Sequence, residues 1–177
     1  MKRVRDSLLL LCIPLYAAFL SLPHVTEVGY IYLRDTAKKA QSEMERLSDE
    51  LEAFRRKYGR YPRASAAGWI TEASATIEGE AVFFIAPGTR SEFIFDPFIA
   101  DAYTQPYRYY SDGERWHVIV CNGPDQDADI DSTFLDTFTK PAYHNLAPRM
   151  YNPGNGYRSG GDVAVIGPRE DPRRESE

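Results

Sequence analysis

A long stretch of regular hydrophobic spacing runs from Leu33 to Tyr58, with apolar residues separated alternately by four and three positions. Side chains with this spacing share one face of an α-helix, so the pattern predicts a single-faced amphipathic helix. Gly59 and the Tyr61-Pro62 pair predict its end, because glycine favours a helix stop and the residue before proline avoids the helical conformation. We expect packing on the chain's own sheet, and the alternative is a coiled coil. The apolar positions are Leu33, Ala37, Ala40, Met44, Leu47, Leu51, Phe54 and Tyr58.

Shorter apolar runs follow the helix and predict strands. Residues 81–86 and 92–95 are such runs, each closed by a turn that contains proline, and residues 162–166 predict a last strand. Residues 63–80 show no periodicity and predict a connecting loop with one short helical turn. A helix followed by strands indicates the α+β class.

The clearest strand signal is an aromatic hairpin centred on Asp112-Gly113. Asp-Gly is a preferred two-residue turn, because both of its positions adopt positive φ. This turn would place Tyr109 opposite Trp116 on an apolar face and Arg108 opposite His117 on a wetter one. His117 is therefore predicted to be solvated rather than a ligand. The two strands would be residues 107–111 and 114–120.

The N-terminus has a pattern of its own. Three cations at Lys2, Arg3 and Arg5 precede an uncharged run at residues 8–22, which predicts an export or anchoring segment with a cytoplasmic N-terminus. The run is shorter than the ~20 apolar residues of a typical membrane span, so an uncleaved anchor and a cleaved signal both stay open. The predicted organisation is an apolar anchor or signal at 1–24, an amphipathic helix at 25–60, a globular antiparallel β domain at 61–168 and a disordered tail at 169–177.

Composition narrows the function classes. At 177 residues with a formal net charge of −5, the chain fits one domain with an appendage and offers no clustered basic face for nucleic acid. Cys12 and Cys121 lie in separate apolar contexts, so neither a disulfide framework nor a metal cluster is expected. No Gly-x-Ser-x-Gly elbow, phosphate-binding glycine loop or histidine cluster is present. We therefore expect a protein that is not an enzyme and has no evident small-molecule substrate.

Four carboxylates alternate along one loop, at Asp125, Asp127, Asp129 and Asp131. Like charges this close resist burial, so they need either water or a cation. The spacing alone allows a solvated acidic turn as well as a calcium site. The loop is not an EF-hand, because Ile130 stands where that loop requires glycine.

Several short motifs in this order resemble the major pseudopilin of type II secretion systems, the protein G family. The motifs are Gly59-Arg60-Tyr61-Pro62 at the helix end, Pro106-Tyr107, Ser111-Asp112-Gly113 and Gly123-Pro124-Asp125. The resemblance implies a pilin-like fold, in which a long N-terminal helix, first an apolar anchor and then amphipathic, packs on a small antiparallel sheet. It also implies Ca²⁺ in the acidic loop, with a main-chain carbonyl near Asn122 and the carboxylates of Asp125, Asp127 and Asp129 as ligands. Asp131 is a further ligand candidate, or it caps the segment after the loop.

The same resemblance implies a structural role in secretion. The chain would be held in the inner membrane by its N-terminal segment, with a periplasmic domain and with other pseudopilins or secretion-machinery proteins as partners. The sequence departs from the family at its N-terminus, where no glycine precedes Gly29 and no acidic residue lies between Leu8 and Leu22. The family carries a peptidase junction with both features. The alternative hypothesis is therefore an envelope-anchored interaction domain of pilin-like fold that does not polymerise.

Overall fold

The computed structural model describes residues 31–65, 68–88, 94–98, 105–152 and 161–168. The apolar run at 8–22 and the predicted disordered tail at 169–177 lie outside these ranges. Within them, no helix combines the length and the apolar character needed to cross a membrane.

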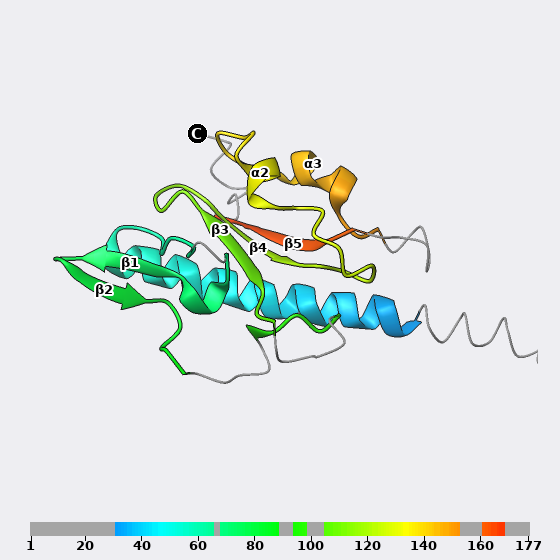
Figure 1. Cartoon of the computed structure of the whole chain (residues 1–177), viewed down its shortest axis with the longest axis horizontal. Helices are drawn as coiled ribbons and strands as arrows, with labels where there is room; N and C mark the ends of the chain where they lie inside the picture. Colours follow the sequence, from blue (N-terminus) through cyan, green and yellow to red (C-terminus); the bar gives the residue numbers. More distant parts are fainter. Residues whose placement is uncertain (1–30, 66–67, 89–93, 99–104, 153–160, 169–177) are drawn as a thin grey trace, which may run out of the picture.

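One long helix, α1 (residues 31–58), lies across one face of a small antiparallel sheet (Figure 1). Most of its predicted apolar stripe packs into a core shared with that sheet, which confirms the amphipathic helix and the α+β class. The helix ends at Gly59, whose φ of 76° is a conformation that glycine adopts without strain. The buried stripe consists of Ala37, Ala40, Met44, Leu47, Leu51 and Phe54.

The central sheet has three antiparallel strands in the order β3-β4-β5. They are β3 (Arg108–Ser111), β4 (His117–Cys121) and β5 (Val163–Gly167). The predicted last strand is thus confirmed within one residue. One face of the sheet packs on α1, and the other is covered by α2 (Ser132–Leu135), α3 (Tyr143–Leu146) and the following η3 (Ala147–Arg149) (Figure 1). Because both faces are covered, every residue of β4 is buried.

A second, two-stranded sheet lies beside the C-terminal end of α1 (Figure 1). It joins β1 (Ser74–Ile77) to β2 (Glu80–Phe83) through a two-residue turn in which both residues have positive φ. The preceding η1 (Ile70–Glu72) supplies the predicted helical turn, but the loop predicted over 63–80 was wrong where β1 lies. That strand is short and buries one side chain, Ala75, so it carries no alternating apolar pattern.

The aromatic hairpin exists, but its predicted register was wrong. Ser111 pairs with His117 and Tyr109 with Ile119, so five residues, not two, form the loop. The cause is Asp112, whose carboxylate accepts hydrogen bonds from the backbone N–H groups of residues 114, 115 and 116 at 3.0, 2.8 and 3.2 Å. The observed pairing of β3 with β4 differs from the predicted one by three residues. Because this number is odd, the side chains of β4 that were expected on one face of the sheet lie on the other. His117 therefore faces α1 and is fully buried, which corrects the prediction that it is solvated.

Candidate functional site

The acidic loop leaves the end of β4 and is pressed against the start of β5. Gly123 makes the closest approach, because a Cβ built there would lie 2.0 Å from the Gly161 carbonyl oxygen. The backbone N–H of Asn122 donates to Asp96 Oδ2 at 2.7 Å, and its side-chain amide donates to the Gln126 carbonyl at 3.2 Å. The loop is thus anchored at its first residues.

The four aspartates of the loop differ in their contacts. Asp125 Oδ2 accepts the Gly161 N–H at 2.7 Å, while Asp131 Oδ1 accepts the Phe134 N–H at 2.8 Å and so caps α2. The main-chain carbonyl of Asp129 accepts a hydrogen bond from Arg149 at 2.6 Å. Asp127 is exposed at the tip. The capping role that the sequence left open for Asp131 is confirmed.

This arrangement bears on the calcium prediction. Calcium takes six to eight oxygen ligands that converge on one point. Within the described ranges, no three acidic, histidine or cysteine side chains gather as a metal site. Calcium binding by Asp125, Asp127 and Asp129 stays a prediction.

A buried ion pair clamps the far end of the loop to the sheet. Arg108 Nη2 lies 3.0 Å from Asp162 Oδ2, and Arg108 Nη1 donates to the Ile130 carbonyl at 2.8 Å. The same Asp162 oxygen accepts the Ile130 N–H at 2.6 Å. Burial raises the pKa of Asp162 to about 6, although the charge of Arg108 opposes this rise. Sequence reasoning missed the clamp, since it expected the face of the hairpin that carries Arg108 to be wetter, whereas the structure covers that face.

A second buried polar cluster joins α1 to the sheet around His117. Its Nε2 lies 2.9 Å from Ser48 Oγ, and its Nδ1 lies 3.9 Å from Glu52 Oε1, which also accepts the Tyr61 hydroxyl at 2.5 Å. Burial, together with the smaller effect of the Arg55 charge, lowers the pKa of His117 from 6.5 to about 3. The imidazole is therefore neutral at physiological pH.

The order serine, histidine, glutamate resembles a catalytic triad, but its burial argues against catalysis. Ser48 is 1% exposed and His117 is 0% exposed, so no substrate reaches either group. A nucleophile needs access to the atom it attacks. We therefore assign this cluster to the joint between helix and sheet.

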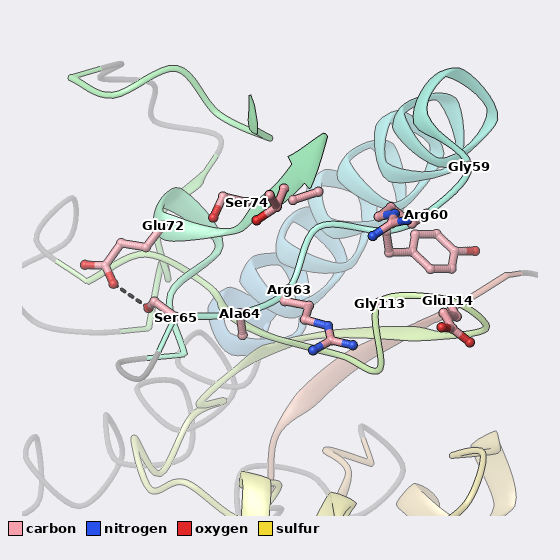
Figure 2. A pocket seen from close by; sticks show the side chains of 12 residues that line it. Gly59, Arg60, Arg63, Ala64, Ser65, Glu72, Ser74, Gly113 and Glu114 are labelled. Carbon is pink, nitrogen blue, oxygen red and sulfur yellow. Dashed lines mark hydrogen bonds between the residues drawn. The ribbon is translucent and has the colours of Figure 1, made fainter. Parts of the chain in front are cut away.

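The largest surface hollow that we describe, about 720 Å³, is lined in part by Tyr61, which also belongs to the His117 cluster. It is lined by the chain that leaves α1, by β1 and by the tip of the β3–β4 loop (Figure 2). Arg60 and Arg63 bring two guanidinium groups to it. The sequence predicted no site here, because the motifs that border the hollow, Gly59-Arg60-Tyr61-Pro62 and Ser111-Asp112-Gly113, were used only as evidence of a family resemblance.

Comparison with known proteins adds no further assignment. No protein-family model, no curated protein and no solved structure matches this chain. Function must therefore be inferred from the chain's own residues and their contacts.

Proposed function

We propose that this chain is a pseudopilin-like structural component of a type II secretion-related system, held in the membrane by its N-terminal segment with its domain in the periplasm. The supporting observation is α1, a single long helix whose apolar face is buried on an antiparallel sheet. The apolar run at residues 8–22 precedes this helix in the sequence. A pilin-like subunit needs such a helix to connect a membrane segment to an outer domain.

The motif residues behind the family resemblance form the joint between α1 and the sheet. Tyr61 is fully buried and donates its hydroxyl to Glu52 on the helix. Tyr107 reaches the helix in the same way, through a hydrogen bond of 2.9 Å from its hydroxyl to Glu43. Tyr109 donates to the Pro62 carbonyl at 2.8 Å. The shared motifs therefore have a structural reason in this chain, which supports a shared architecture.

Ca²⁺ belongs to this proposal as a stabiliser of the domain. The acidic loop joins the sheet to the α2–α3 layer, and like charges on Asp125, Asp127 and Asp129 oppose a compact loop. A divalent cation would offset that repulsion and add stability by mass action. The ion would have no catalytic role.

The N-terminal departure from the family supports the second candidate, an envelope-anchored interaction domain that does not polymerise. Both candidates predict a membrane-bound chain, so the first test is the mature N-terminus. We expect mass spectrometry of the protein from membrane fractions to find residues 8–22 retained. A chain recovered only in soluble fractions, cut after this run, would contradict the membrane-anchored proposal.

A further inference from the structure

The surface hollow in Figure 2 combines two kinds of unused binding group in one place. Its walls are the segment that leaves α1, the outer edge of β1 and the tip of the β3–β4 loop. Its volume of about 720 Å³ falls within the usual range of ligand pockets. The backbone groups and the side chains that line the hollow together indicate the class of ligand.

The outer edge of β1 presents an unused pair of backbone groups. Arg63 and Ser74 exchange two backbone hydrogen bonds, of 2.7 and 3.1 Å, so the polar backbone groups of Ser74 point away from β2. Backbone direction alternates along a strand, so the N–H and C=O of Thr76 point the same way. If the antiparallel pairing of Arg63 with Ser74 continued, Tyr61 would pair with Thr76. Tyr61 instead donates its N–H to the Gly113 carbonyl at 3.0 Å. Among the described residues no backbone partner takes this N–H or C=O, so Thr76, which is exposed, offers a donor and an acceptor to the hollow.

Two arginines supply the charge. Arg60 and Arg63 are exposed, and neither has a carboxylate partner within salt-bridge distance in the part of the chain that the structure describes. The side chain of Arg63 lies over Gly113, where a Cβ would be 2.8 Å from its Nε. Figure 2 shows its guanidinium directed from the 59–65 segment toward the β3–β4 loop.

Two carboxylates also line the hollow and restrict the class of ligand. Glu72 accepts a hydrogen bond from the Ser65 hydroxyl, and Glu114 lies beside Gly113 at the tip of the loop (Figure 2). They would repel a dense polyanion such as polyphosphate. A polypeptide suits the hollow better, because its backbone matches the edge of β1 and its acidic side chains can be spaced to meet the arginines.

We infer that this hollow is a peptide-binding slot that receives an extended acidic segment of a partner protein. The segment adds to the edge of β1 through hydrogen bonds with the backbone of Thr76. Its carboxylates pair with Arg60 and Arg63, since guanidinium and carboxylate form strong two-point hydrogen bonds. The slot does not depend on assembly, so either a polymerising subunit or a single domain can use it.

The test measures fluorescence anisotropy of a labelled peptide that alternates glutamate and valine, titrated with the full chain in detergent. We expect saturable binding that weakens about tenfold in Arg60→Glu and in Arg63→Glu, because each removes a charged hydrogen-bonded pair. The matched control is Arg56→Glu, which reverses a nearby exposed charge outside the slot and should change the affinity less than about twofold. If all three variants lost the same amount of affinity, the effect would come from the overall charge of the protein and not from the slot, and the inference would be overturned.

Two further peptides test the backbone contact and the charge without changing the protein. A peptide methylated on alternate backbone nitrogens should lose binding, because it cannot donate to the strand edge. A peptide with lysine in place of glutamate should not bind. Absence of saturable binding by the original peptide would overturn the inference. Binding of the methylated peptide with the same affinity as the original peptide would also overturn the inference. Displacement of the original peptide by inorganic phosphate at comparable concentration would overturn it as well.

Discussion

The buried imidazole of His117 makes a strong prediction about how stability depends on pH. Its pKa is about 3 in the folded chain and 6.5 when it is free of its surroundings. Between these values the unfolded state binds the proton and the folded state does not, so the free energy of unfolding decreases as pH falls. The slope is about 1.4 kcal/mol per pH unit for one group. Lowering the pH from about 7 to about 4 should therefore cost about 3 kcal/mol through His117 alone.

Asp162 acts in the opposite direction and would hide this effect in the wild-type protein. Burial raises its pKa from 3.8 to about 6, so the folded state binds the proton more tightly. The stabilisation that this proton adds to the folded state is present at low pH and is lost as pH rises through about 6. The two contributions are similar in size and opposite in sign. The prediction therefore concerns a difference between variants, not the raw pH profile.

The comparison variant is His117→Gln, which keeps a polar side chain beside Ser48 but cannot titrate. We expect the stability of the wild type relative to this variant to decrease by about 3 kcal/mol between about pH 7 and about pH 4. The assay is urea unfolding of the full chain in detergent at each pH. His144→Gln removes an exposed histidine and is the matched control. A wild-type-to-variant difference that stays constant across this range would refute the assignment of a buried, neutral His117.

Three further predictions concern the acidic loop. Gly123→Ala should destabilise the protein by more than the ~1–2 kcal/mol cost of a left-handed alanine, because its Cβ meets the Gly161 carbonyl. Gly88→Ala, which has a similar positive φ in open space, is its control in thermal unfolding, and equal losses would argue against the contact. Arg108→Met should lower the urea unfolding free energy by about 3–5 kcal/mol, since it leaves a buried carboxylate without its cation; a loss below about 1 kcal/mol would speak against the clamp. Calcium at 100-fold excess over its dissociation constant should add about 2.7 kcal/mol. Asp127→Asn should remove most of this calcium-dependent stabilisation, whereas the control Asp49→Asn, on α1 outside the loop, should keep it. A melting temperature that calcium leaves unchanged would rule the ion out.

Local patterns in the sequence predicted the elements that depend on local rules. The helix from Leu33 to Tyr58 was predicted because its apolar spacing is long and regular. The last strand was predicted because it is a short apolar run bounded by turn residues. The N-cap role of Asp131 was also within reach, since an aspartate directly before a short helix is a common cap.

Specific hydrogen bonds, some of them local and some between distant segments, decided the rest. The carboxylate of Asp112 gathers three backbone N–H groups, which lengthens the hairpin loop and reverses which side chains of β4 face the helix. No local pattern of Asp-Gly distinguishes this loop from a two-residue turn. The burial of His117 follows from that register, whereas Arg108 is buried because its face of the sheet is covered, so both were missed. Asp125 is held by Gly161, 36 residues away, which loop spacing could not indicate.

Crosslinking in intact cells tests the proposed role as a structural subunit most directly. The full chain, produced in its own host with an epitope tag, would be treated with formaldehyde and analysed by size on a blot. The proposal predicts a membrane-associated ladder of dimers, trimers and higher multimers, absent from a control that lacks residues 1–24. A membrane-bound chain that gives monomers alone would contradict the subunit role and leave the non-polymerising interaction domain.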